Sequence, residues 1–68
     1  MERNLVSGLM EQIERVGVIR SHAVGIGSAG AFLVAMIDLE LSTARKALSS
    51  GDIIAMVLAY KSLKEIQE

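Results

Sequence analysis

The stretch from Phe32 to Ile66, FLVAMIDLELSTARKALSSGDIIAMVLAYKSLKEI, decides the fold that this sequence predicts. In its first half Leu33, Ile37 and Leu41 recur every four residues, which is the spacing of one face of an α-helix. The apolar stripe is wider than a coiled-coil seam requires, because further apolar residues lie beside it. This pattern predicts a helix over residues 31–48.

A turn is predicted where the apolar period stops, at Ser49-Ser50-Gly51-Asp52. Gly51 can adopt the left-handed conformation in which many helices end. Ser49 and Asp52 have the spacing of a capping box, and Ser50 is an equally suitable N-cap. The period resumes after the turn and predicts a second helix over residues 52–66. Two helices joined by so short a turn are expected to pack as an antiparallel hairpin.

The residues before this hairpin predict a shorter helix and a connector. Leu5, Leu9 and Ile13 recur every four residues and indicate a helix over residues 4–16. Residues 17–30 hold four of the six glycines, and we interpret them as a glycine-rich connector.

An alternative for the middle of the chain is that the second helix starts early, near Ser21. The helix would then carry small residues four apart, a pattern that lets two helix backbones approach closely. These small residues are Ala23, Gly27, Ala31 and Ala35.

The segment from Gly25 to Gly30, GIGSAG, matches the glycine pattern of dinucleotide-binding loops. Such a loop functions at the end of a parallel sheet, which a chain of 68 residues with this helical pattern cannot build. We therefore interpret the glycines as part of a flexible or closely packed connector.

Catalytic and metal-binding patterns are not found in the sequence. His22 is the single histidine and there is no cysteine, so the usual metal-ligand sets are missing within one chain. Ser21, His22 and Asp38 follow one another along the chain without a scaffold for a catalytic triad. We predict no catalytic residue, no cofactor and no metal, and therefore a protein that is not an enzyme.

Composition points to association with another chain. Apolar residues make up 51% of the sequence and the mean hydropathy is +0.45. A chain of this length has a small interior, and only Phe32 and Tyr60 are aromatic. The excess apolar surface predicts a homo-oligomer or a helical partner protein.

Net charge is −1, which favours neither nucleic acid nor an anionic membrane as a partner. Two alternatives remain open: a nucleic-acid-binding regulator of the helical-hairpin dimer type, and a small membrane-associated protein using residues 21–37, which carry no formal charge. The absence of cysteine and of a signal-peptide pattern at Met1–Asn4 predicts a cytoplasmic location.

Together these features predict a single all-α domain over residues 1–68, with an antiparallel helical hairpin and a shorter N-terminal helix, assembled into an oligomeric helix bundle. Its predicted function is a non-catalytic protein–protein interaction module, such as a small adaptor, co-chaperone or regulatory subunit, that acts by burying apolar helix faces. The residues expected to close the hairpin are Leu33, Ile37, Leu41, Leu48, Ile53, Val57, Tyr60 and Leu63. The residues expected at the interface between chains are Leu5, Leu9, Ile13, Phe32, Met36, Leu39 and Met56.

Overall fold

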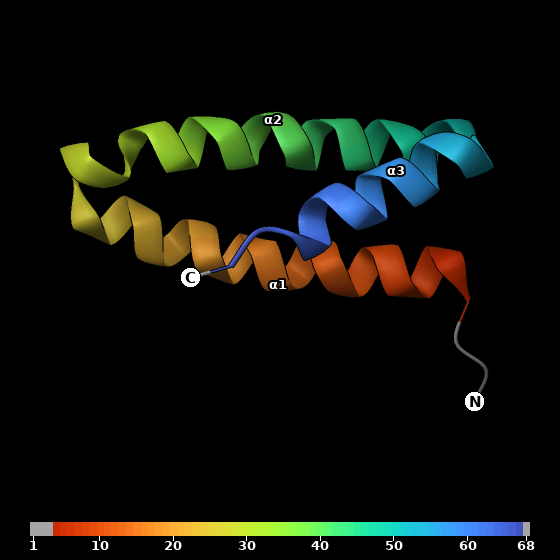
Figure 1. The fold of residues 1–68 in the computed structure, drawn as a ribbon, viewed down its shortest axis with the longest axis horizontal. Helices are drawn as coiled ribbons and strands as arrows, with labels where there is room; N and C mark the ends of the chain where they lie inside the picture. Colours follow the sequence, from red (N-terminus) through yellow and green to blue (C-terminus); the bar gives the residue numbers. More distant parts are fainter. Residues whose placement is uncertain (1–3, 68) are drawn as a thin grey trace.

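The computed structural model describes residues 4–67, which form three α-helices and no strand. Helix α1 spans Leu5–Ile26, α2 spans Ser28–Ser50 and α3 spans Ile53–Lys64. α1 and α2 lie side by side with opposite directions, and α3 turns back from the end of α2 and runs obliquely toward α1 (Figure 1). The prediction of an all-helical fold is confirmed.

The first helix begins at a well-formed cap. The Ser7 backbone N–H donates to Oδ1 of Asn4 at 2.8 Å, and the Asn4 backbone N–H donates to Oγ of Ser7 at 3.3 Å. This reciprocal pair satisfies backbone donors that a helix start otherwise leaves without partners. The helix therefore starts near the predicted residue.

The predicted connector over residues 17–30 is wrong, because helical structure continues through most of it. α1 runs on to Ile26 and α2 starts at Ser28, so Gly27 is the only residue between them. The alternative start near Ser21 is also wrong, since Ser21 belongs to α1. Each glycine within a helix costs only about 1 kcal/mol relative to alanine. Burial of Ile19 and Ala23 on the extended part of α1 offsets that cost.

The turn between α1 and α2 depends on two glycines with different roles. Gly27 has φ +83° and ψ −138°, a conformation that a side chain would strain. Gly30, in the first turn of α2, lies against the backbone of Ala23 in α1. A Cβ on Gly30 would overlap the carbonyl oxygen of Ala23 and lie 2.9 Å from its carbonyl carbon. The backbones of α1 and α2 are therefore in direct contact next to the turn.

The second turn follows the sequence prediction in one respect and departs from it in another. Gly51 adopts the left-handed conformation, with φ +70° and ψ +18°, as predicted. The N-cap of α3 is Asp52 rather than Ser49 or Ser50, because the Ala55 N–H donates to Oδ1 of Asp52 at 3.1 Å. α2 consequently extends to Ser50, and α3 ends at Lys64 rather than at Ile66.

The core lies between the three helices and is built from a few large side chains separated by alanines. Leu9, Val16, Ile37 and Leu63 are fully buried. The seam of α3 differs from the prediction, because Ile53 and Val57 are exposed while Met56 and Ala59 face inward. The other buried apolar residues of this core are Ile19, Leu41, Ala44, Ala47 and Ile66.

Arg15 attaches the end of α3 to α1. Its Nη2 donates to the carbonyl oxygen of Leu63 at 2.7 Å, and its Nε donates to Oε1 of Gln12 at 2.9 Å. A positive charge at a helix C-terminus interacts favourably with the helix dipole, and the Leu63 carbonyl accepts the Ile66 backbone N–H at 3.1 Å as well. This bond fixes where α3 stops relative to α1.

An ion pair on the exposed surface joins α1 to α2. The guanidinium of Arg20 donates from Nη2 to Oδ2 of Asp38 at 3.2 Å and from Nε to Oδ1. The hydrogen bonds and the charge of Arg20 lower the pKa of Asp38, and Asp38 in turn raises the pKa of Arg20. Both side chains are exposed, so water and salt weaken the pair.

Substitution of Gly30 tests the backbone contact. Gly30→Ala should lower the free energy of unfolding by about 1–3 kcal/mol, because α1 and α2 must separate to admit the methyl group. Gly17→Ala is the matched control, since Gly17 is also helical and has no atom within 4 Å of the added Cβ. The control should gain about 1 kcal/mol from helix propensity. Urea denaturation followed by circular dichroism measures both, and equal shifts in the two variants would contradict the close contact.

Acid denaturation tests the ion pair between Arg20 and Asp38. The pKa of Asp38 is lower in the folded chain, so the pair contributes stability above the unfolded-state pKa of about 3.9, and this contribution disappears as pH falls through the folded-state value. The stability difference between the wild type and Asp38→Asn should therefore be constant near neutral pH and shrink in acid. A difference that stays unchanged down to the lowest pH would show that Asp38 makes no charge-dependent contribution.

Candidate functional site

The interface predicted from the sequence divides into exposed and buried residues. Phe32 is 81% exposed, Leu39 is 68% exposed and Met36 is 39% exposed, all on α2. These side chains are available to another molecule.

The remaining predicted interface residues pack within the chain itself. Leu9 and Met56 are buried in the core, so their assignment to an interface is corrected. Leu5 and Ile13 are partly buried and pack against the core cluster. The sequence could not separate these residues from Phe32 because every apolar stripe in the chain is broad enough to serve either role.

Helix α3 contributes exposed apolar residues that the sequence analysis did not assign. Ile54 is 74% exposed and Leu58 is 60% exposed, one helical turn apart. The four-residue spacing of these two residues could have identified them in the sequence. They lie beside the side of α3 that packs against the core, which includes the small residues Ala55 and Ala59. A seam of small residues lets α3 pack closely while its larger side chains point outward.

The exposed residues of α2 and α3 lie on the same side of the molecule. Met36 and Glu40 of α2, Ser62 of α3 and Glu65 just after α3 line one hollow, so these flanks of the two helices face each other. Residues three or four apart share a flank of a helix. Phe32 and Leu39 accordingly lie beside Met36 on α2.

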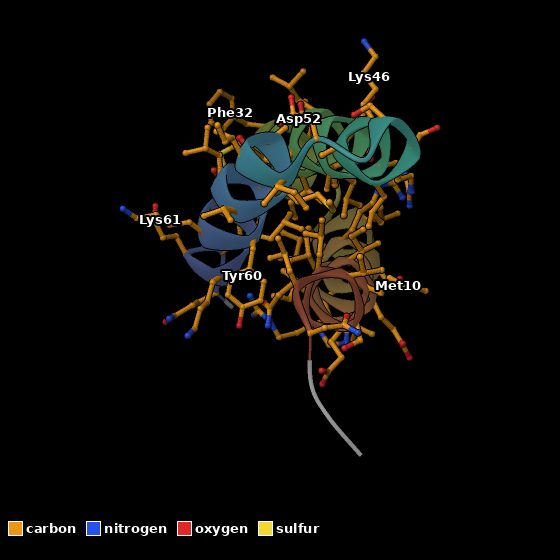
Figure 2. All side chains as sticks on the ribbon, turned by 90° about the vertical axis from the view of Figure 1, so that its right-hand side faces the viewer. Met10, Phe32, Lys46, Asp52, Tyr60 and Lys61 are labelled. Atoms are coloured by element: carbon orange, nitrogen blue, oxygen red, sulfur yellow. The ribbon has the colours of Figure 1, made fainter. Side chains whose placement is uncertain are left out.

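The same spacing places Ile54 and Leu58 on the flank of Ser62. Figure 2 shows Phe32 and Lys61 on the side of α3, while Met10 projects from the opposite side. We call the set formed by Phe32, Met36, Leu39, Ile54 and Leu58 the apolar strip.

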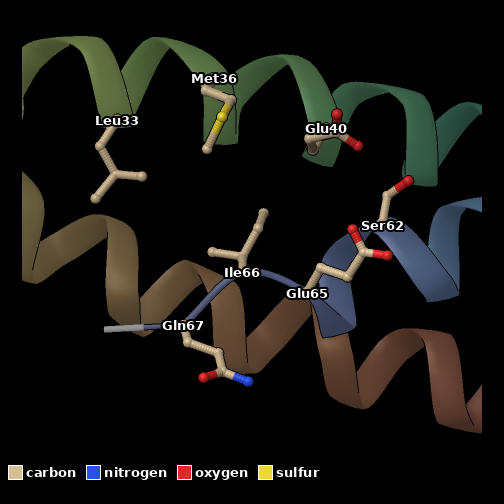
Figure 3. Close-up of a pocket in the computed structure, with 7 residues that line it drawn as sticks. All are labelled: Leu33, Met36, Glu40, Ser62, Glu65, Ile66 and Gln67. Atoms are coloured by element: carbon tan, nitrogen blue, oxygen red, sulfur yellow. The ribbon is translucent and has the colours of Figure 1, made fainter.

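The hollow beside the strip has a volume of about 380 Å³ and opens where α3 diverges from α2 (Figure 3). Leu33 and Met36 point into it from α2, and Ile66 rises toward them from the residues that follow α3. Its polar edge is formed by side chains from both helices and from the end of the described chain. These are Glu40, Ser62, Glu65 and Gln67.

A smaller hollow of about 230 Å³ lies between the last part of α1 and Leu33 of α2. It is lined by Ile19, Ala23 and Ile26 of α1 together with Leu33, and Gln67 borders both hollows. His22 also lines it. α3 has 12 residues and α2 has 23, about 18 Å and 34 Å of helix, so α3 covers only about half of α2.

Charged side chains lie beside the apolar strip and between its α2 and α3 members. Lys61 lies on the outer flank of α3, one turn after Leu58, and Glu65 follows one turn later. Glu40 lies one turn after Met36 on α2. The exposed apolar residues of α2 and of α3 thus lie near a hollow whose lining includes Glu40 and Glu65.

Other kinds of site were considered over residues 4–67. In that part of the chain no three histidine, cysteine, aspartate or glutamate side chains lie close enough together to hold a metal ion. No helix there combines the length and the apolar character needed to cross a membrane. Residues 21–37, the segment considered for a membrane span, are divided between α1 and α2 at Gly27.

Comparisons of the chain with protein-family models, with curated proteins and with solved structures found no match. The strip is therefore interpreted from its own geometry alone.

Paired substitutions on α2 should separate the strip from the core. Leu39→Ser should change the free energy of unfolding by less than about 0.5 kcal/mol, because Leu39 is already mostly exposed. Leu41→Ser should cost about 3 kcal/mol or more, since Leu41 is buried and the hydroxyl would have no partner. Chemical denaturation at low protein concentration measures both changes. A large loss of stability in Leu39→Ser would place Leu39 in the internal core.

Proposed function

We propose that this protein is a non-catalytic protein–protein interaction module that acts by burying the apolar strip of α2 and α3 against another chain. The observation that supports the proposal is the strip itself: five large apolar side chains of α2 and α3, four of them at least 60% exposed. The largest apolar patch of a folded protein is often functional. Small adaptors, co-chaperones and regulatory subunits belong to this functional class.

The size of the strip fits this role. At the exposures given above, its side chains present on the order of 600 Å² of apolar surface, at about 200 Å² for each complete side chain. A stable interface buries about 800 Å² on each partner, with an apolar centre and a polar edge. The strip would supply the centre, and Lys61, Glu65 and Glu40 would supply part of the edge.

The energy of burial also favours use of the whole strip. Removing about 600 Å² from water contributes on the order of 15 kcal/mol at about 25 cal/mol per Å². Association costs an estimated 4–15 kcal/mol in lost freedom of motion. On this scale one side chain of the strip contributes only about 3 kcal/mol, less than the cost of association, so no single residue would suffice for binding, and loss of one central side chain should weaken it strongly.

The proposal includes an arrangement and a location. The antiparallel pairing of α2 with α3 forms one layer, and the layer of a second chain covers it, which gives an oligomeric helix bundle. The partner is another copy or a helical protein with a complementary apolar face. The cytoplasmic location predicted from the sequence is part of the same proposal.

Site-specific cross-linking in the cells that make the protein tests the function. A photoreactive amino acid at Leu39 should give a covalent adduct larger than the chain, because this position would lie in the contact. The matched control carries the same group at Met10, which is 56% exposed and lies on the opposite side of the molecule (Figure 2). Adducts at position 39 and not at position 10 are expected. Equal adduct formation at both positions, or none at Leu39, would contradict the proposal.

A further inference from the structure

The three residues that follow α3 run between α1 and α2 without helical structure (Figure 3). We propose that these residues, 65–67, form a strap that closes the groove between the two helices, and that Arg15 is the latch that holds the strap shut. Opening of the strap leaves the three helices folded and joins the two hollows described above into one apolar groove. This inference is independent of the proposed function, which uses the outer surface of α2 and α3.

The strap is anchored in the groove by one side chain. Ile66 is only 8% exposed and belongs to the core cluster, whereas Glu65 and Gln67 on either side of it are exposed. The backbone N–H groups of Glu65 and Ile66 donate to the carbonyls of Lys61 and Leu63. These backbone bonds attach the strap to the end of α3 and not to the groove. The strap can therefore leave the groove without breaking them.

The local sequence does not explain why α3 ends at Lys64. The next three residues are glutamate, isoleucine and glutamine, which are all compatible with a helix, and neither glycine nor proline stands among them. The apolar period of the sequence likewise predicts a helix through Ile66. The end of α3 is therefore imposed by contacts with the rest of the molecule, and it depends on those contacts.

Arg15 of α1 supplies the contact at this point. In a continuing helix the Leu63 carbonyl would accept the N–H of Gln67, four residues later. It accepts instead a bond from Nη2 of Arg15 at 2.7 Å and a bond from the N–H of Ile66 at 3.1 Å. A carbonyl oxygen has two lone pairs, so these two bonds occupy the acceptor. The chain consequently leaves the helix and enters the groove.

The guanidinium of Arg15 is oriented by its own helix. Its Nε donates to Oε1 of Gln12, one turn earlier on α1, at 2.9 Å, and the Arg15 side chain is half-buried. Hydrogen bonds from a charged donor are stronger than neutral ones, and an oriented side chain loses less freedom in forming them. A single strong bond of this kind holds the strap and can break without disrupting the core.

The strap separates two hollows that share a boundary. Leu33 and Gln67 line both the hollow of about 380 Å³ and the hollow of about 230 Å³. Ile66 rises from the strap toward Leu33 and Met36 (Figure 3). Ile66 thus occupies the groove in the closed state, and its release exposes apolar side chains of both helices. Those along the groove are Ile19, Ala23 and Ile26 of α1 and Leu33 and Met36 of α2.

Thiol labelling of the full chain measures the opening, because the sequence has no cysteine of its own. Ile66→Cys places a thiol on the strap, and Ala44→Cys places one in the core, where Ala44 is fully buried. The thiol at position 66 should react at least about tenfold faster than the thiol at position 44, because local opening is more frequent than unfolding. Low concentrations of urea should accelerate only the reaction at position 44, since unfolding exposes much more surface.

Arg15→Met tests the latch, since methionine keeps an apolar stem and removes the charged donors. In the Ile66→Cys chain it should raise the labelling rate at least about tenfold, because the bond to the Leu63 carbonyl holds only the closed strap. Arg20→Met is the matched control. Arg20 is also on α1, and its bond to Asp38 of α2 persists when the strap opens. The control should leave the labelling rate at position 66 unchanged.

Hydrogen exchange followed by NMR gives a second measurement on the chain with its native Ile66, because Ile66→Cys itself weakens the anchor. Arg15→Met should accelerate exchange of the Ile66 amide by about tenfold or more, and Arg20→Met should not. If the thiol at position 66 reacts as fast as in an unfolded chain with or without Arg15, exchange of the Ile66 amide decides between the two roles of Arg15.

Two results would overturn the inference. Equal labelling rates at positions 66 and 44, with the same dependence on urea, would show that the strap moves only when the chain unfolds. Exchange of the Ile66 amide that Arg15→Met leaves unchanged would show that Arg15 does not hold the strap.

Discussion

The backbone contact between Gly30 and Ala23 governs the arrangement of the other elements. A chain of 68 residues with two aromatic side chains has little bulk with which to fill an interior, so its helices must come close together to exclude water. Gly30 allows α2 to leave the turn at Gly27 in direct contact with α1. The α1–α2 pair then provides a narrow surface on which α3 packs through Ala59 and its neighbours.

The length and position of α3 explain why apolar surface remains exposed. α3 is attached to α1 by the bond from Arg15 to the Leu63 carbonyl, and it is directed away from α2 as it approaches that bond (Figure 1). The divergence opens the hollow between Met36 and Ile66 and leaves the first half of α2 covered by α1 but not by α3. The apolar residues of that half cannot all reach the core, because the core side of α2 is already occupied by Ile37, Leu41 and Ala44.

Sequence reasoning could predict the fold class because helical periodicity is local, and the turn at Gly51 because its left-handed conformation is a local property of glycine. It could not predict that Gly17 and Gly25 lie within a helix, since the cost of those glycines is smaller than the tertiary burial that offsets it. The contact of Gly30 with Ala23 depends on how two helices approach, which no single segment specifies. The small residues at positions 23 and 27 did indicate close packing. The prediction placed them together in a single helix, whereas the close contact forms between two helices.

The candidate site was predictable only in part for a related reason. Periodicity identified Phe32, Met36 and Leu39 as apolar and helical, yet it also favoured Leu9 and Met56, which are buried in the core. Ile53 and Val57 were assigned to the hairpin seam, although the oblique path of α3 turns them outward. When an apolar stripe is this broad, a rotation of the helix about its axis by a few tens of degrees moves some of its apolar residues from the core to the surface and others from the surface to the core.

How far each apolar side chain is exposed matters more than the number of exposed apolar residues. α1 also exposes apolar side chains, but charged groups lie among them. Val18 shares a shallow hollow with Glu11, Glu14 and Arg15. Farther along the same helix, the ion pair of Arg20 with Asp38 lies before Val24. Isolated exposed apolar residues are ordinary on folded proteins. On the α2–α3 side Phe32, Ile54 and Leu39 are 81%, 74% and 68% exposed, more than any large apolar side chain of α1, and this exposure distinguishes a surface suited to a partner from one suited to water.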